Sequence, residues 1–222
     1  MHFSFLSLPT VTSEINRPDP ALIEQARAFP ASTLHEAAGK IGALPSAIKP
    51  AAPSFRICGP ALTVHSPPAD NLWLHRAIYA AQPGDILVVY VSGHYEAGYW
   101  GEVMSTAAKA RKLGGLVIDG SVRDGDLLED LGFPVFARGL CMRGTGKDFN
   151  ARGWINAPVQ IEDIVVHPGD LVVGDTDGVV VIPQARIGET LAASKKREEF
   201  EADIMRKLEA GENTLDLLGL NR

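Results

Sequence analysis

Short apolar runs, separated by polar turns and helix-like segments, predict a sheet through the centre of the chain. Residues 86–91 form the most strand-like run, and residues 116–118 are apolar at every position, as in a strand covered on both faces. Residues 102–113 and 125–131 have helical patterns, and residues 134–138 form the next strand. This βαβα order predicts parallel strands joined by crossover helices.

The segments before this region predict two short helices, two strands and a further helix. Asp19 is placed to cap a helix over 19–28, with Pro20 in its first turn, and Gly39 to end a helix over 32–39. Strands are expected at 55–58 and 61–65, separated by Gly59 and Pro60. Residues 71–81 predict an amphipathic helix.

The pattern changes after residue 150. Apolar runs at 159–161, 164–166, 171–173 and 178–182 alternate with turn residues, which predicts an antiparallel β-meander. A charged helix over 184–212 follows, and it is longer and more polar than one domain of this size needs. We therefore expect one domain spanning 1–222, with an N-terminal arm at 1–20 and a C-terminal helix whose second half packs on another subunit.

Composition narrows the class of protein. The chain has 222 residues, 45% of them hydrophobic, and a net charge of -6, which argues against general nucleic-acid binding. No apolar run approaches the ~20 residues needed to cross a membrane, and the N-terminus lacks the pattern of a signal peptide. With only Cys58 and Cys141, a disulfide framework is not expected, so a cytoplasmic protein is the simplest interpretation.

The polar turn after the strand at 116–118 carries the strongest candidate for chemistry. Arg123 and Asp124 lie where the carboxyl ends of parallel strands form a ligand crevice, and Glu102 begins the preceding helix. An arginine beside a carboxylate suits an oxo-acid and a hard cation such as Mg²⁺ or Mn²⁺. The alternative is that Asp124 only caps the helix after it.

Other candidates are weaker. The glycine-rich loop 92–101 precedes a helix and is suited to hold a carboxylate or phosphate. The histidines show no close ligand pair, and residues 141–148 depart from a phosphate-binding loop at both ends. Lys147 is conceivable as a Schiff-base lysine, without a supporting context. Glu36 has no obvious local partner, and a solvated glutamate is the simplest interpretation.

The chain resembles the RraA-like family, in particular its branch of class II pyruvate aldolases. These include the 4-hydroxy-4-methyl-2-oxoglutarate and 4-carboxy-4-hydroxy-2-oxoadipate aldolases. The most specific part of the resemblance is Glu102 followed, after twenty residues, by Arg123 and Asp124. Supporting segments lie at 132–139, 167–170 and 174–183. The resemblance implies a three-layer β/β/α fold of the swivelling-domain type, with parallel core strands, a C-terminal β-meander and a long C-terminal helix.

The resemblance also implies a role for each site residue. Asp124 would be the direct ligand of a divalent metal, Glu102 would hold water bound to that metal, and Arg123 would face the 2-oxo oxygen. Glu36 and Glu199 match acidic positions that a neighbouring subunit supplies, although the adjacent Glu198 leaves that register open. The backbone of the loop would bind the pyruvyl carboxylate; its residues are Gly98, Tyr99, Trp100, Gly101, Glu102 and Val103.

The activity implied is cleavage of a 4-hydroxy-2-oxo acid to pyruvate and a second oxo-acid, by a homotrimer or homohexamer that needs Mg²⁺ or Mn²⁺. Decarboxylation of oxaloacetate would be a side activity. Neither nucleic acid nor a membrane is an expected partner. A different class remains open, because some RraA-like proteins inhibit an RNA-degrading endonuclease without catalysis. Such an inhibitor has no need of the Arg123–Asp124 pair.

Overall fold

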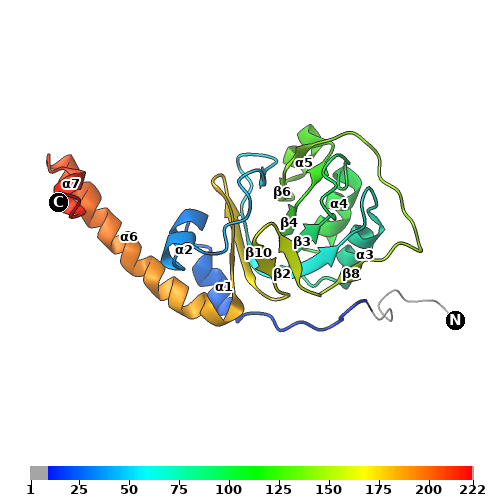
Figure 1. Ribbon diagram of the computed structural model, residues 1–222, viewed down its shortest axis with the longest axis horizontal. Helices are drawn as coiled ribbons and strands as arrows, with labels where there is room; N and C mark the ends of the chain where they lie inside the picture. The colour runs from blue at the N-terminus through cyan, green and yellow to red at the C-terminus, as the bar shows by residue number, and fades with distance from the viewer. Residues whose placement is uncertain (1–9, 222) are drawn as a thin grey trace.

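A computed structural model describes residues 10–221, and the first nine residues of the predicted arm lie outside the described residues. One large sheet organises the chain, with the strand order β1-β6-β4-β3-β2-β11-β12 and with β8 paired to β2 (Figure 1). The strands β3, β4 and β6 run parallel, as predicted, and β2 is parallel to them as well. Their bounds are Ile57–His65, Ile86–Tyr90, Gly115–Ile118 and Val135–Ala137.

The remaining strands of this sheet bring its two ends close together. Strand β1 (Lys49–Pro50) pairs with β6, whereas β11 (Leu171–Asp175) and β12 (Gly178–Ile182) lie beyond β2. Lys49 on β1 donates a hydrogen bond to the carbonyl of Asp177 in the β11–β12 turn. The sheet is therefore nearly closed and barrel-like, within the α/β class that the sequence predicts.

Helices cover the sheet on two sides. On one side lie α3 (Leu72–Ala80), α4 (Glu102–Ala110) and α5 (Gly125–Leu131), packed on the parallel strands. On the other side lie α1 (Pro20–Ala26), α2 (Ala31–Ala37) and the first turns of α6 (Ile187–Glu209) (Figure 1). A second, smaller core joins these three helices to β11 and β12, and it includes Leu34, Val173, Ile182 and Leu191.

The two strands predicted at 55–58 and 61–65 are one continuous strand, β2. Gly59 and Pro60 do not interrupt it, because the neighbouring strand changes at this point. Residues 57–60 pair with β11 on one edge, and the parallel pairing with β3 begins only at Ala61. A side chain at Gly59 would lie 2.4 Å from the carbonyl oxygen of Gly84, so glycine permits this close approach.

The predicted meander is also corrected. Strands β9 (Val159–Ile161) and β10 (Ile164–Val166) form an antiparallel pair of their own, and only β11 and β12 join the main sheet. Four short strands were not predicted. They are β1, β5 (Ser121–Val122), β7 (Gly139–Leu140) and β8 (Trp154–Ile155), and each is too short to show a period.

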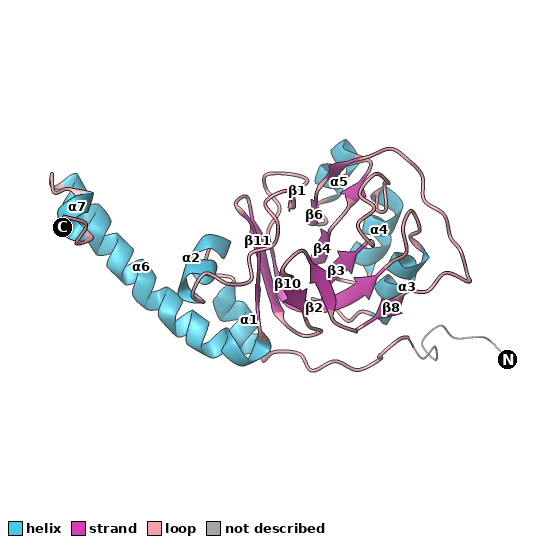
Figure 2. Cartoon of the chain, in the orientation of Figure 1, coloured by secondary structure: helices cyan, strands magenta, loops and turns pink. Residues whose placement is uncertain are grey.

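The C-terminal helix is shorter than predicted. A 3-10 turn (Gln184–Arg186) precedes α6, which ends at Glu209, and Gly211, at φ 97°, precedes a separate helix α7 (Thr214–Leu217). The buried residues of α6 all lie in its first half, up to Ser194. Its second half projects away from the rest of the chain (Figures 1 and 2).

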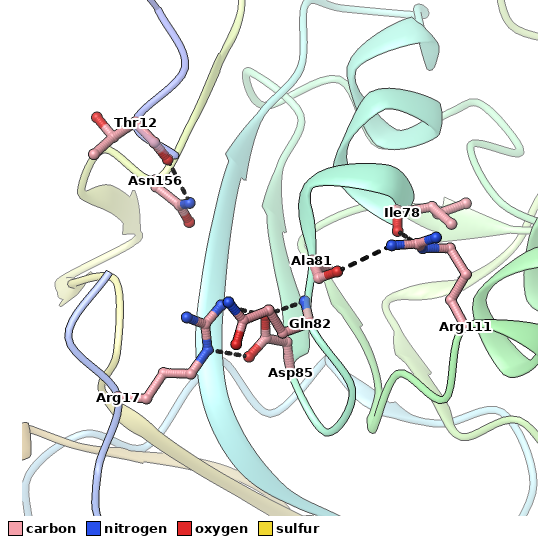
Figure 3. A network of polar contacts seen from close by, with 8 residues as sticks. All are labelled: Thr12, Arg17, Ile78, Ala81, Gln82, Asp85, Arg111 and Asn156. Atoms are coloured by element: carbon pink, nitrogen blue, oxygen red, sulfur yellow. Dashed lines mark hydrogen bonds and ion pairs between the residues drawn. The ribbon is translucent and has the colours of Figure 1, made fainter. Parts of the chain in front are cut away.

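The described part of the N-terminal arm is bound to the sheet. Arg17 donates two hydrogen bonds, of 2.8 and 2.7 Å, to the fully buried carboxylate of Asp85 (Figure 3). The same carboxylate accepts the N–H of Gln82, so it closes the turn before β3. The side-chain amide of Asn156 donates to the carbonyl of Thr12 at 2.7 Å, which fixes the arm at a second point.

Candidate active site

The buried strand β4 leads into the candidate site. After the turn at Asp119, strand β5 pairs in parallel with β7, and the next residue is Arg123. The backbone N–H of Arg123 donates to the carbonyl of Trp100 at 2.8 Å. This bond joins the turn after β4 to the loop that follows β3, which is the neighbouring parallel strand. The two segments thus meet at the carboxyl ends of their strands, as expected of a ligand crevice.

Asp124 is not the cap of its own helix. It precedes α5 with a left-handed backbone (φ 61°, ψ 40°), and its side chain makes no hydrogen bond to that helix. Instead, its Oδ2 accepts the backbone N–H of Glu102, the first residue of α4, at 3.1 Å. A left-handed conformation costs a non-glycine residue on the order of 1–3 kcal/mol, and such residues cluster at functional sites.

The spacing between Glu102 and Asp124 therefore corresponds to a direct contact between two helix starts. The side chain of Glu102 is exposed, so what reaches Asp124 is its backbone. Gly101 makes this approach possible, because a Cβ there would lie 2.2 Å from Asp124 Oδ2. The Nε of Arg123 lies 3.8 Å from the same oxygen, so a guanidinium and a carboxylate sit side by side.

Arg123 and Asp124 line a cavity of about 320 Å³. Several of its lining residues come from the loop 98–103, although Glu102 is not among them. Asn71, His75, Gly144 and Thr145 were not singled out as site residues in the sequence, because they lie at the start of α3 and in the segment after β7, far from the motif along the chain. Lys147 was considered only as a Schiff-base lysine. The cavity is lined by Asn71, His75, Gly98, Tyr99, Trp100, Gly101, Val103, Met104, Arg123, Asp124, Gly144, Thr145 and Lys147.

The loop 98–103 has some of its backbone N–H groups free for an anion. The N–H groups of Gly98 and Tyr99 donate to the carbonyls of Arg143 and Ser121. Within the part of the chain that the structure describes, the N–H groups of Trp100, Gly101 and Val103 have no acceptor. They stand at the start of α4, where unpaired N–H groups and the helix dipole favour negative charge.

The two aromatic residues of this loop support its backbone. The buried Tyr99 hydroxyl donates to the carbonyl of His94 at 2.9 Å and accepts the N–H of Ala69 at 2.8 Å. Burial raises the pKa of the Tyr99 hydroxyl above its usual range. The indole N–H of Trp100 donates to the hydroxyl of Ser105 at 2.6 Å. Both side chains are therefore buried and hydrogen-bonded, which holds the backbone of the loop in place.

The donors at this site fit a divalent metal that keeps most of its water. In the described range 10–221, no group of three His, Cys, Asp or Glu residues is arranged to hold an ion. For direct coordination the site offers the carboxylate of Asp124, whose Oδ2 accepts the N–H of Glu102 and whose Oδ1 makes no hydrogen bond to the described residues. A single carboxylate with open positions for water and substrate suits Mg²⁺ or Mn²⁺.

Glu36 and Glu199 lie away from Arg123 and Asp124. They belong to α2 and α6, on the side of the sheet opposite α4 and α5 (Figure 1). The expectation that Glu36 lacks a local partner is wrong, since its carboxylate lies 3.8 Å from Lys40 and 3.6 Å from Arg197. The pairing with Lys40 spans one helical turn and was readable from the sequence. Glu199 and Glu198 are both exposed on α6.

Several known proteins are similar to this chain in sequence or in fold. A family model described as Aldolase/RraA matches residues 21–181. A protein of Halalkalibacterium halodurans named "Putative 4-hydroxy-4-methyl-2-oxoglutarate aldolase" is 35% identical over 176 residues, which cover 79% of this chain and 83% of that protein. An uncharacterized protein of Pseudomonas syringae has a crystal structure with a TM-score of 0.78 and 27% identity, covering 91% of this chain and 99% of that one.

A third relative carries a different description. The crystal structure of Streptomyces coelicolor RraAS2, described as an unusual member of the RNase ES inhibitor RraA protein family, has a TM-score of 0.74. It is 26% identical and covers 86% of this chain and 100% of that one. The fold and the site thus define an α/β protein of the RraA type. The chain belongs to the Aldolase/RraA family. Over residues 10–221, no helix is long and apolar enough to cross a bilayer.

Proposed function

We propose that the protein is a divalent-metal-dependent aldolase that cleaves 4-hydroxy-2-oxo acids to pyruvate and a second oxo-acid. One observation carries the proposal: Arg123, Asp124 and the start of α4 line one cavity, with the Asp124 carboxylate fixed by the N–H of Glu102. The aldolase names of the curated relatives support the same reaction class. Decarboxylation of oxaloacetate follows as a side activity, because both reactions pass through the enolate of pyruvate.

The residues of this chain divide the work of cleavage. A bound divalent ion supplies a Lewis acid that polarises the 2-oxo group. The free N–H groups at the start of α4 bind the substrate carboxylate, and the carboxylate of Asp124 would hold the ion. A carboxylate among Glu102, Glu36 and Glu199 relays the proton away from the C4 hydroxyl. The C3–C4 bond then breaks, the C4 oxygen becomes a carbonyl, and Arg123 stabilises the enolate until C3 is protonated.

Glu36 and Glu199 enter the proposal as groups supplied by a neighbouring subunit of a homotrimer or homohexamer. The exposed second half of α6, which carries Glu199, supports this arrangement. It is tested by mixing two inactive proteins, one with Arg123→Ala and one with Glu199→Ala. If the site is shared, mixed oligomers contain some intact sites and recover activity. Two variants that stay inactive together, in an oligomer shown by native mass spectrometry to exchange subunits, would contradict a shared site.

The experiment that tests the function is a pyruvate-release assay, coupled to lactate dehydrogenase, with 4-hydroxy-4-methyl-2-oxoglutarate and with oxaloacetate. Release should stop after chelation with EDTA and return with Mg²⁺ or Mn²⁺. Arg123→Ala should lower kcat by roughly 10²–10³, the usual effect of removing a preorganised charge stabiliser. Full activity after exhaustive chelation would reject the metal-dependent mechanism.

The second candidate function is inhibition of an RNA-degrading endonuclease without catalysis. The similarity to the RNase ES inhibitor family supports it. An RNA-cleavage assay with an endonuclease of that type separates the two functions. If the wild-type protein releases no pyruvate but inhibits the endonuclease, and the inhibition persists in Arg123→Ala, the second candidate would be favoured over the first.

A further inference from the structure

The segment between β7 and β8 is the longest stretch without regular structure beside the cavity (Figure 2). It contains the Arg143-Gly-Thr-Gly-Lys147 run that did not fit a phosphate loop, and the proposed cleavage chemistry gives it no role. Nevertheless, Gly144, Thr145 and Lys147 line the same cavity as Arg123 and Asp124. Lys147 is therefore a second cation in a site for an anionic substrate.

The backbone on both sides of Lys147 is fixed. Gly146 donates its N–H to the carbonyl of Ala69 at 2.7 Å, and its carbonyl accepts the N–H of Asn71. The N–H of Asp148 donates to Asp70 Oδ2 at 2.6 Å, and the Asp70 side chain is buried. The side chain of Lys147 is exposed, but the hydrogen bonds of Gly146 and Asp148 fix its backbone on both sides.

Among residues 10–221, the ammonium group of Lys147 has no hydrogen-bond or ion-pair partner. Across the described residues, no carboxylate lies within ion-pair distance of it. The carboxylate of Asp70, which contacts this segment, already accepts the N–H groups of Leu72 and Asp148. Lys147 also acts on the cavity wall, since its charge contributes, after burial, to lowering the pKa of His75.

The size of the cavity leaves room beyond a pyruvyl group. At about 30 Å³ for each water molecule in the liquid, a volume of about 320 Å³ corresponds to roughly ten waters. Arg123 and Asp124 offset one another in charge. Besides Arg123, Lys147 is the one permanently charged cation among the described residues that line the cavity. His75 does not count as a cation, because burial lowers its pKa and favours the neutral imidazole. A second carboxylate on the substrate therefore has one cationic partner in this lining, which is Lys147.

We infer that Lys147 is a specificity-determining residue, which binds a second carboxylate on the half of the substrate that does not become pyruvate. The inference rests on the proposed aldolase function and goes beyond it by assigning a residue to the far half of the substrate. Lys147 takes no part in breaking the C3–C4 bond. It sets which 4-hydroxy-2-oxo acids bind well, and it favours diacids over monoacids.

The test compares two substrates that differ only at this point, 4-hydroxy-2-oxoglutarate and 4-hydroxy-2-oxopentanoate. The wild type should prefer the diacid. Lys147→Met should lower kcat/KM for the diacid by roughly 10- to 100-fold, mainly through KM, as expected for loss of a charge-assisted hydrogen bond. It should leave the monoacid within about two-fold, and Lys147→Arg should keep most of the preference. Lys112→Met, an exposed lysine at the end of α4, is the matched control.

A binding measurement separates this inference from the proposed function. 2-Oxoglutarate and 2-oxopentanoate lack the C4 hydroxyl and cannot be cleaved, so calorimetry with Mg²⁺ present reports their affinities alone. Lys147→Met should weaken 2-oxoglutarate and spare 2-oxopentanoate. Equal losses for both ligands, or no preference in the wild type, would overturn the assignment of Lys147. Failure to release pyruvate from either substrate, with the binding preference intact, would instead reject the aldolase function.

Discussion

The carboxylate of Asp124 and the backbone N–H of Glu102 form a hydrogen bond of 3.1 Å between the starts of two different helices. Asp124 immediately precedes α5, yet its side chain accepts a hydrogen bond from the first backbone N–H of α4. One residue thus fixes the angle between two helices and the position of the proposed metal ligand. Its structural and chemical roles can be separated, because only the chemical role needs the negative charge.

Asp124→Asn and Asp124→Ala should therefore differ in stability but not in activity. The asparagine keeps an oxygen for the Glu102 N–H, so its Tm should stay close to that of the wild type, whereas alanine should cost about 0.5–2 kcal/mol, as for a lost helix cap. Both should lower pyruvate release by roughly 10²–10³. Thermal unfolding and the coupled assay check the two effects. Asp124→Asn with more than half of wild-type activity would show that the charge is not needed.

Gly101→Ala should impair catalysis without unfolding the protein. Gly101 has an extended backbone (φ -162°), which any residue adopts, so the effect is steric: the new Cβ would lie 2.2 Å from Asp124 Oδ2. We expect kcat/KM to fall at least about ten-fold as the carboxylate is displaced. Gly139→Ala is the matched control, since its Cβ would meet nothing within 4 Å. Equal activity in the two variants would contradict the steric argument.

Breaking the bond between the arm and the sheet should reduce stability. Arg17→Ala leaves the fully buried Asp85 carboxylate with only the N–H of Gln82, and we expect a loss of about 1–3 kcal/mol. Urea unfolding measures this change. Arg186→Ala, which breaks an exposed pair with Glu189, is the control and should stay within about 0.5 kcal/mol. A similar small loss for both would mean that the arm contributes little.

Acid should destabilise the fold through His65. Burial lowers the pKa of this histidine below 6.5; its ring stacks on Trp154 at 3.9 Å, and its Nε2 lies 2.8 Å from the hydroxyl of Ser92. Because the unfolded chain takes up the proton first, the contribution of His65 is present above about pH 6.5 and is lost as the pH falls toward the folded pKa. The urea midpoint should decline as the pH falls below about 6.5, and less so in His65→Gln. Equal declines would point to other groups.

The sequence was sufficient to predict the parallel strands β3, β4 and β6 and the meeting of Asp124 with the start of α4. The apolar run at 116–118 can be read from neighbouring residues alone. The spacing from Glu102 to Arg123 and Asp124 can be read from the order of elements, and in the structure Glu102 and Asp124 are in contact. What the sequence could not show is contact across distance. Strand β2 continues through Gly59 and Pro60 because its neighbour changes there, and no local pattern records that.

The same reason explains the cavity residues that were not singled out for the site. Asn71 and His75 on α3 meet the segment around Lys147 through the hydrogen bonds at Asp70, which join residues more than seventy positions apart. In the sequence, Asp70 is an ordinary loop residue before a helix. The role of Asp124 was ambiguous for a similar reason, because a helix-start aspartate usually caps its own helix, and here it binds another one.

The bonds at Asp70 also have a consequence for engineering. With the backbone bonds of Gly146, they divide the segment between β7 and β8 into a pinned portion, Gly146 to Asp148, held by the residues just before α3, and a remainder in which Ala151 accepts one bond from Trp73 of α3. Changes of length after Asp148 would leave the cavity wall in place, whereas a single deletion within the pinned portion would shift the lysine off the wall. Libraries that aim to alter substrate range should therefore vary side chains at 144, 145 and 147 and keep the length of that stretch constant.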